Sequence, residues 1–186
     1  MALAEMAPAA RWLGWAPLAA ACAHIFEEFA WPGGFMVWYR EYRGPAASRI
    51  TPRFLMLINT ALLIGCWDAA AATDTPVTRA FWLAMCAVLG ANGCWHLWAA
   101  ARTHRYSPGV ITGVLLYIPL AAYGFAAYIG SGRVSVRTAA ASAIAGASYP
   151  IWSAVFHASG RGRQRPREPG YPQVGLGSSL HNIHYT

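Results

Sequence analysis

The chain has 186 residues, of which 56% are hydrophobic and only 11% are charged. Because ordinary soluble domains carry roughly one quarter charged residues, this composition excludes a soluble fold as the main organisation. The net charge of +7 comes from arginine without any lysine, and most of the arginines lie in predicted loops and the tail. Anionic lipid headgroups are therefore the expected partner of this charge, and a nucleic-acid-binding function is excluded.

Five apolar stretches are each long enough to cross a hydrocarbon core, for which about 20 helical residues suffice. The sequence therefore predicts an all-α, polytopic membrane helix bundle with five transmembrane helices and no separate soluble domain. A signal peptide is the alternative for the first stretch, but its apolar run continues past the small residues around Cys22, which favours a span. The predicted spans are Ala10 to Trp31, Pro52 to Ala71, Val77 to Ala101, Gly109 to Gly130 and Val134 to His157.

The loop after the first span is long enough to hold an element of its own. Between Phe35 and Arg43 aromatic residues alternate with charged ones, which predicts a short interfacial helix on the inner leaflet. An irregular aromatic-rich loop is the alternative. From residue 160 onwards Gly, Pro, Arg and Ser dominate, as is typical of a disordered tail. Residues 1–159 are thus predicted to form the membrane bundle and residues 160–186 a basic cytoplasmic tail.

The distribution of arginine predicts the orientation of the bundle, because arginine-rich loops stay in the cytoplasm. The first loop, the third loop and the tail carry most of the arginines, so we expect the N-terminus outside and the C-terminus inside. The cysteines lie within predicted spans and lack the spacing of metal-binding motifs. We interpret them as packing residues; they are Cys22, Cys66, Cys86 and Cys94.

Three titratable residues stand near the end of the first apolar stretch. His24 and Glu28 are four positions apart and His24 and Glu27 three, so on a helix the imidazole can face either carboxylate. Ionisable side chains at membrane depth are costly and indicate a functional site. The two carboxylates diverge by about 100° around a helix and cannot share one partner, so at least one must meet a basic group, a metal or water.

Polar residues of the other predicted spans lie at a similar depth, counted at about 1.5 Å per helical residue from the cytoplasmic ends. Polar side chains within a bundle must face one another or water, because lipid offers no partner. This shared level predicts a polar pocket in the cytoplasmic half of the bundle. Its candidate residues are Asn59, Thr60, Asn92, His96, Thr112 and His157, with Arg102 and Tyr106 at the lip.

Three motifs occur in order along the chain: His24-x-x-Glu27-Glu28, Asn92-x-x-x-His96 and Tyr106-x-Pro108-Gly109-x-x-Thr112. Together they resemble the HXXEE family of small bacterial integral membrane proteins, which is named for the first motif. The resemblance implies a membrane domain of unassigned activity in a bacterial inner membrane. It also supports His24, Glu27, Glu28 and His96 as the site residues.

A divalent metal site is the leading hypothesis for this pocket. Imidazole and carboxylate together are ligands of zinc, iron and manganese, and a metal would offset the cost of burying carboxylates. We expect an enzyme acting on a lipid-like or isoprenoid substrate, with Asn59, Asn92, Arg102, Tyr106, Thr112 and Trp95 contacting that substrate. The metal ligand candidates are His24, Glu27, Glu28, His96 and His157.

Two alternatives remain. In metal-free acid–base catalysis, a buried protonated glutamate would act beside histidine on a hydrophobic substrate, as in isomerisation or cyclisation. Aromatic rings would line that pocket and stabilise a cationic intermediate. In the non-catalytic alternative, the polar residues form a packing network or the binding site of an accessory protein. The candidate pocket walls are Trp31, Trp95, Trp98, Tyr117 and Trp152.

Overall fold

The structure is a computed structural model that describes residues 8–44 and 50–149. Every regular element within these ranges is helical, which confirms the all-α prediction. A short π-helical segment, η3, interrupts the helix that follows the third loop. The elements are α1 (Pro8–Phe29), α2 (Phe35–Arg43), α3 (Pro52–Ala71), α4 (Pro76–Thr103), α5 (Val110–Thr112), η3 (Gly113–Tyr117), α6 (Ile118–Gly130) and α7 (Val136–Ala147).

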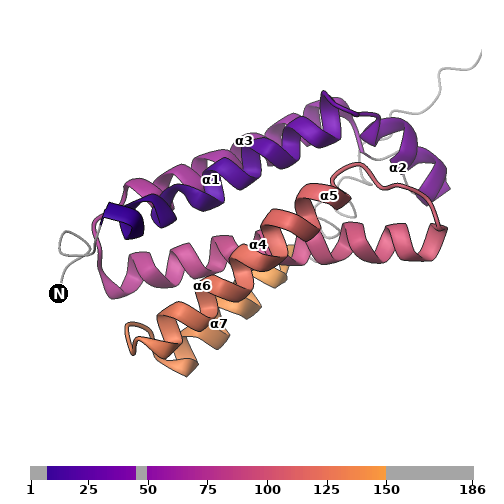
Figure 1. Cartoon of the computed structure of the whole chain (residues 1–186). Coiled ribbons are helices and arrows are strands. Elements are labelled where there is room, and N and C mark those ends of the chain that lie inside the picture. The colour runs from indigo at the N-terminus through magenta and orange to yellow at the C-terminus, as the bar shows by residue number, and fades with distance from the viewer. Residues whose placement is uncertain (1–7, 45–49, 150–186) are drawn as a thin grey trace, which may run out of the picture.

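The helices pack around α4, the longest of them (Figure 1). The α1 and α3 helices lie side by side, and α4 packs against α6 and α7 as well as α3. The buried core contains Leu83, Cys86 and Leu89 of α4 together with Ala21 of α1 and Tyr117 of η3. The bundle therefore places α1 and η3 on one side of the central helix, where the candidate site lies.

Local signals in the sequence set the starts of the two long central helices. Thr75 and Thr78 form a capping box at the start of α4, where Pro76 occupies the first turn. The hydroxyl of Thr51 accepts a hydrogen bond from the amide of Phe54 at the start of α3. Such caps satisfy amides that have no partner within the helix, and proline fits the first helical turn because it needs no donor there.

The segment from α5 to α6 approaches α4 very closely at a pair of glycines. A Cβ atom on Gly93 would lie 2.8 Å from the carbonyl oxygen of Gly113, and one on Gly113 would lie 3.0 Å from the Cα of Gly93. A larger residue at either position would separate the two helices. This contact brings the third loop and η3 against the half of α4 that carries His96.

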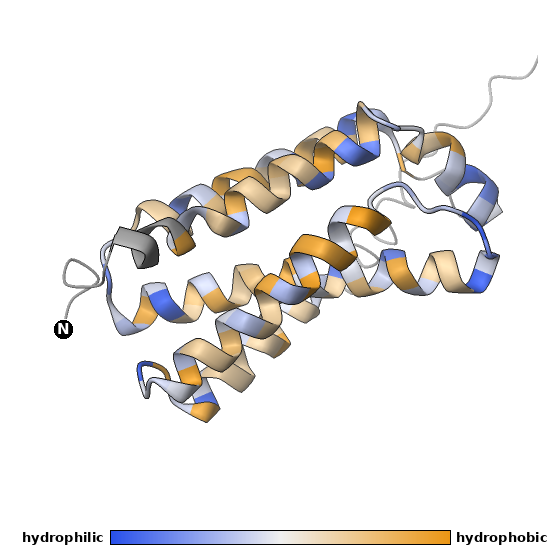
Figure 2. Cartoon of the chain, viewed as in Figure 1, coloured by the Kyte–Doolittle hydropathy of each residue, from blue (hydrophilic) through white to orange (hydrophobic). Residues whose placement is uncertain are grey.

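Three of the helices are long and apolar enough to cross a membrane: Pro52–Ala71, Pro76–Thr103 and Val110–Gly130. The hydrophilic residues gather towards the helix ends and loops (Figure 2). Three of the five predicted spans are thus confirmed by length and composition. The α1 helix carries two adjacent glutamates near its end, and α7 is described over only 12 residues, shorter than the roughly 20 that a span needs.

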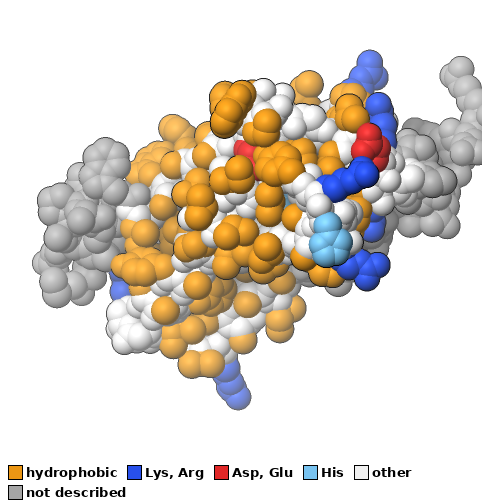
Figure 3. All heavy atoms as spheres, turned by 45° about the vertical axis from the view of Figure 1, so that its right-hand side comes forward, with side chains coloured by type: hydrophobic (Ala, Val, Ile, Leu, Met, Phe, Trp, Pro, Cys, Tyr) orange, Lys and Arg blue, Asp and Glu red, His pale blue; other side chains and the backbone are white. Residues whose placement is uncertain are grey.

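Large apolar side chains cover much of the outside of the bundle (Figure 3). Exposed examples on different helices are Ile64, Trp67, Leu97, Leu115 and Ile144. Arginine side chains gather towards one end of the visible face, next to the apolar surface. An apolar exterior with charges at the end is the pattern expected of a bundle surrounded by lipid.

An ion-pair network lies at the end of the bundle that carries the α3–α4 and α6–α7 loops. Asp74, in the loop between α3 and α4, accepts hydrogen bonds from Arg79 at 2.6 and 2.9 Å and from Arg133 at 2.5 Å. Arg79 also donates to the carbonyl oxygen of Arg133 at 3.2 Å. The two neighbouring guanidinium groups hold the pKa of Asp74 below its ordinary value. This network joins the α3–α4 loop to the α6–α7 loop.

The short helix predicted in the first loop is present as α2 (Phe35–Arg43), with its predicted boundaries. Phe35 is buried, and the glycines that precede and follow the helix, Gly34 and Gly44, both have positive φ. Such backbone angles are accessible to glycine without strain. The predicted tail, together with His157 and Trp152, lies outside the described residues.

Candidate metal centre

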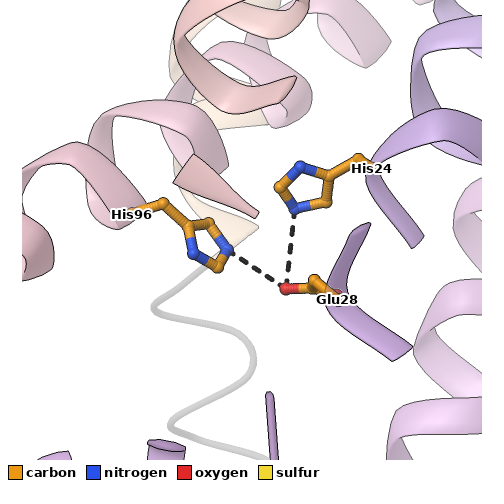
Figure 4. Close-up of side chains that lie close together, drawn as sticks. All are labelled: His24, Glu28 and His96. Carbon is orange, nitrogen blue, oxygen red and sulfur yellow. Dashed lines mark ion pairs between the residues drawn. The ribbon is translucent and has the colours of Figure 1, made fainter. Parts of the chain in front are cut away.

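Two histidines and one glutamate meet in the interior of the bundle (Figure 4). His24 and Glu28 lie one turn apart on α1, and His96 comes from α4. Oε1 of Glu28 lies 3.1 Å from Nε2 of His96 and 3.5 Å from Nε2 of His24. The imidazoles of the first and third apolar helices thus meet at one level, as predicted, but of the two adjacent acids only Glu28 contacts them.

All three side chains are buried, with exposed fractions of 2% for His24, 6% for Glu28 and 0% for His96. The two contacts with Glu28, dashed in Figure 4, are ion pairs when the imidazoles are protonated, and neither Nε2 atom has a hydrogen-bond partner among the described residues. Buried polar atoms are rarely left without a partner, because the loss of hydration costs about 1–3 kcal/mol. Two such nitrogens facing one carboxylate oxygen call for a common partner.

The spacing of these three atoms suits a metal ion. One ligand atom from each residue lies within 4.8 Å of the others. Nitrogen and oxygen ligands at about 2.0–2.1 Å from a tetrahedral zinc ion are separated by about 3.3 Å. The two separations from Glu28, 3.1 and 3.5 Å, bracket this value. The His24, Glu28 and His96 cluster could therefore hold a metal.

Glu27 lies outside this group, because hydrogen-bond donors surround its carboxylate. Oε1 accepts hydrogen bonds from the Tyr106 hydroxyl at 2.7 Å and from the amides of Gly109 and Ile111 at 3.1 and 3.0 Å. Oε2 accepts from the amide of Thr112 at 2.7 Å and from its hydroxyl at 2.5 Å. Glu27 thus caps the start of the α5 helix from another element, a position where a negative charge is stabilised.

The loop between α4 and α5 is shaped around this carboxylate. Gly109 has a φ of +99° and precedes α5 without a capping side chain of its own. A Cβ atom at Gly109 would lie 2.7 Å from Cε1 of His24 and 2.9 Å from Cε1 of His96. Glycine is therefore needed here for two reasons, the backbone angle and the close approach to both imidazoles.

Each histidine has a hydroxyl group at its second nitrogen. Nδ1 of His24 lies 2.8 Å from Oγ1 of Thr112, and Nδ1 of His96 lies 3.0 Å from Oγ of Ser107. In histidines that bind metals through Nε2, Nδ1 commonly forms a hydrogen bond to a neighbouring polar group, and this bond fixes the ring orientation. Both rings are thus held so that their Nε2 atoms point towards Glu28.

Aromatic rings cover the cluster on two sides. Tyr117 of η3 stacks on His24 with ring centroids 4.4 Å apart and planes inclined by 26°. Trp38 of α2 lies over His96 with centroids 6.3 Å apart, and the Trp95 ring meets His96 edge-on at 4.7 Å. The hydroxyl of Tyr117 is a further buried atom without a hydrogen-bond partner among the described residues. Apolar rings therefore separate the cluster from its surroundings.

Tyr106 is the residue of the third loop whose side chain turns inward. Burial, followed by the hydrogen bond to Glu27, raises the pKa of its hydroxyl. The hydroxyl therefore stays protonated and donates a hydrogen bond to the carboxylate of Glu27. Tyr106 and Thr112, predicted as substrate contacts, are thus both engaged with Glu27 in this structure.

The remaining predicted site residues differ in their distance from the cluster. Asn92 lies one turn before His96 on α4, and its buried Oδ1 has no hydrogen-bond partner among the described residues. Arg102 is exposed and lies over the ring of Trp98. Asn59 is half-buried on α3, with no hydrogen bond to the cluster within residues 8–44 and 50–149. Asn92 is therefore near the cluster, whereas Arg102 belongs to the protein surface.

Two features of the site were not predicted from the sequence: Ser107 as the partner of His96, and the position of α2 over the cluster. Ser107 is fully buried beside Pro108, and its place within the third motif was the available signal. The alternation of aromatic and charged residues in α2 indicated a helix but not the face that Phe35 and Trp38 present to His96. Tertiary packing, rather than local pattern, decides that orientation.

The fold and the cluster together define a helical protein with apolar, membrane-length helices and a buried histidine–carboxylate centre. A family model described as a protein of unknown function with HXXEE motif matches residues 15–124, more than half of the chain. The chain therefore belongs to the HXXEE family, as its three motifs predict. Comparisons with curated proteins and with solved structures found no match.

Proposed function

We propose that the protein is an integral membrane metalloenzyme whose divalent metal, zinc, iron or manganese, is held by His24, Glu28 and His96. The observation that carries this proposal is the pair of buried Nε2 atoms without hydrogen-bond partners beside one carboxylate oxygen. Two histidines and a carboxylate bind zinc in hydrolytic enzymes and iron in oxygenases, and both leave positions open. His157 and Glu27, the other candidate ligands, are not needed for this set.

A bound metal would offset the free-energy cost of burying the Glu28 carboxylate more completely than a simple polar network would. A carboxylate buried beside two imidazoles carries a desolvation penalty, which their contacts at 3.1 and 3.5 Å offset only in part. A divalent cation would bind both nitrogen lone pairs and neutralise Glu28 at once. When bound, it would supply Lewis acidity or an acidic bound water. The chain itself would orient the imidazoles and exclude bulk water.

We propose a lipid-like or isoprenoid substrate. The rings of Tyr117, Trp38 and Trp95 surround the cluster, and the outer surface of the bundle is apolar. Such surroundings favour a hydrophobic molecule entering from the membrane. Exposed arginines near the end of α4, Arg102 and Arg105, are suited to an anionic headgroup.

We also propose that α1 and the segment beginning with α7 cross the membrane, giving five spans with the C-terminus in the cytoplasm of a bacterial cell. The α1 helix runs beside α3, and α7 packs along α4. A helix that accompanies a membrane-spanning partner along its length shares its depth. Single-cysteine variants at positions 3 and 132, made in a chain without its native cysteines, should react with a membrane-impermeant thiol reagent from outside, and variants at positions 41 and 175 should react only from the cytoplasmic side. Labelling of positions 3 and 41 from the same side would reject a spanning α1, and labelling of positions 132 and 175 from the same side would reject the fifth span.

Elemental analysis of the detergent-purified protein tests the metal proposal. We expect close to one zinc, iron or manganese ion per chain, lost in His24→Ala, His96→Ala and Glu28→Gln. His104→Asn provides a matched control, because His104 is exposed at the end of α4 and asparagine tolerates its positive φ. A wild-type protein that stays metal-free after incubation with each ion would reject the metal proposal. Acid–base catalysis or a packing network would then be the better account.

A further inference from the structure

Glu27 is the acidic residue of the first motif that does not take part in the metal cluster. Its carboxylate accepts hydrogen bonds from three backbone amides and two hydroxyls. The amides of Gly109, Ile111 and Thr112 can only donate. A set of donors of this kind stabilises the ionised carboxylate, which has no proton to give.

The hydroxyl of Thr112 has one proton and lies between two groups. Its Oγ1 is 2.5 Å from Oε2 of Glu27 and 2.8 Å from Nδ1 of His24, and the carbonyl oxygen of Gly109 is a more distant acceptor at 3.4 Å. Because the ionised Glu27 can only accept, the hydroxyl proton points to Glu27. The lone pairs of Oγ1 then remain for His24, so Nδ1 must carry a proton and donate it to Thr112.

This proton assignment determines the state of the other ring nitrogen. In a neutral imidazole one nitrogen is protonated and the other carries a lone pair. With the proton on Nδ1, the lone pair of His24 lies on Nε2, the buried atom that faces Glu28 and lacks a hydrogen-bond partner. The chain of contacts therefore prepares His24 for binding a metal through Nε2 before any metal arrives.

We propose that Glu27 and Thr112 are positioning residues, which act through the Nδ1 atom of His24 to make its Nε2 a metal ligand. This proposal rests on the proposed metal site and assigns different roles to the adjacent glutamates. Glu28 would bind the metal, and Glu27 would set the tautomer of His24 through a hydroxyl. Metal-binding histidines often contact a carboxylate directly at the second nitrogen; here a threonine stands between the two groups.

The two histidines differ in how firmly their tautomers are set. Ser107 contacts Nδ1 of His96 at 3.0 Å, but no acidic group receives its hydroxyl proton within the described residues. Ser107 can therefore donate or accept, and it does not force one tautomer on His96. This difference makes Ser107→Ala a useful comparison with variants of Thr112.

Nitrogen NMR of the metal-free protein, labelled with ¹⁵N histidine, tests the proposal directly. The His24 signals, assigned by their loss in His24→Ala, should show the proton on Nδ1 in the wild type. They should show the same tautomer in Thr112→Ser, which keeps the hydroxyl, and in the control Thr60→Val, because Thr60, although predicted to lie in the pocket, is exposed on α3. Thr112→Val should shift the proton wholly or partly to Nε2. A wild-type proton on Nε2, or an unchanged tautomer in Thr112→Val, would overturn the proposal.

Zinc affinity, measured by competition with a chelator, separates this proposal from the metal site itself. We expect Thr112→Val and Glu27→Gln to weaken zinc binding by about 10–100-fold while one ion still binds at saturation, and Thr112→Ser to restore it. Wild-type affinity in Thr112→Val would refute the positioning role but leave the metal site intact. If no variant, including the wild type, binds a metal, the metal site fails, and the NMR result alone decides the tautomer.

Discussion

Oε1 of Glu28 lies 3.1 Å from Nε2 of His96, and this contact joins α1 to α4 at the buried cluster. The adjacent Glu27 turns instead to the start of α5, where its oxygens accept from Thr112 and two further backbone amides. Neighbouring residues on a helix diverge by about 100°, which explains why the two carboxylates reach different elements. Their separate partners lead to separate experimental consequences.

Glutamine substitutions should distinguish the two glutamates. Glu28→Gln should abolish stoichiometric metal binding, because an amide is a poor ligand. Glu27→Gln should still bind metal at saturation. It should lower the unfolding temperature, because the amides and hydroxyls that donate to Glu27 lose their charged acceptor, at a cost of about 1–3 kcal/mol. Thermal unfolding and metal content of both variants check this. Equal behaviour of the two variants would contradict the assignment.

Gly109→Ala should lower stability more than Gly34→Ala. Both positions have positive φ, +99° and +88°, so each alanine pays a similar backbone cost of about 1–2 kcal/mol. Only at Gly109 would the new methyl group meet the two imidazoles, at 2.7 and 2.9 Å, whereas nothing lies within 4 Å at Gly34. Gly109→Ala should also weaken metal binding. Indistinguishable unfolding temperatures would show that the approach to His24 and His96 is unimportant.

Asp74→Asn should destabilise the end of the bundle opposite the cluster, and the effect should depend on pH. The arginine partners lower the folded-state pKa of Asp74 below its unfolded value, which is about 3.9. The contribution of the carboxylate to stability is therefore complete above that value and is lost as the pH falls below it. The difference in unfolding temperature between wild type and Asp74→Asn should be constant from pH 7 to about 5 and shrink below pH 4.

Asp68→Asn is the matched control, because Asp68 is exposed on the neighbouring α3 helix. This variant should unfold at nearly the wild-type temperature at pH 7. A difference for Asp74→Asn that grows as the pH falls would contradict the depressed pKa.

Trp38→Ala should open a path to the cluster. The Trp38 ring lies over His96, stacks on Tyr42 with centroids 5.1 Å apart and meets Trp95 edge-on at 5.7 Å. Its loss should speed the removal of bound metal by a water-soluble chelator, because the cluster would be less shielded. Trp31→Ala is the control, since that ring is 73% exposed. The same removal rate in both variants would rule out shielding by α2.

The sequence predicted the helices and the meeting of His24 with His96, because ionisable residues within apolar helices must find polar partners. The start of α3, at Pro52, and the limits of α2 also follow from local signals. Two predicted spans do not reach the length and composition of the other three among the described residues. For α1, the acidic pair that defines the site also makes the helix less apolar.

The separate roles of Glu27 and Glu28 could not be predicted from the sequence. Spacing on α1 allows His24 to face either carboxylate, and the choice is made by the third loop. That loop brings the amides of Gly109, Ile111 and Thr112 to Glu27, which depends on the contact between Gly93 and Gly113. Only the packing of distant segments reveals which acid remains for the histidines.

X-ray absorption spectroscopy of the zinc-loaded protein is the most direct test of the metal centre. We expect nitrogen and oxygen ligands at about 2.0–2.1 Å, with the outer-shell scattering of two imidazoles. A sulfur ligand at about 2.3 Å would point to cysteine and would contradict the account. A spectrum with no imidazole scattering would contradict it equally.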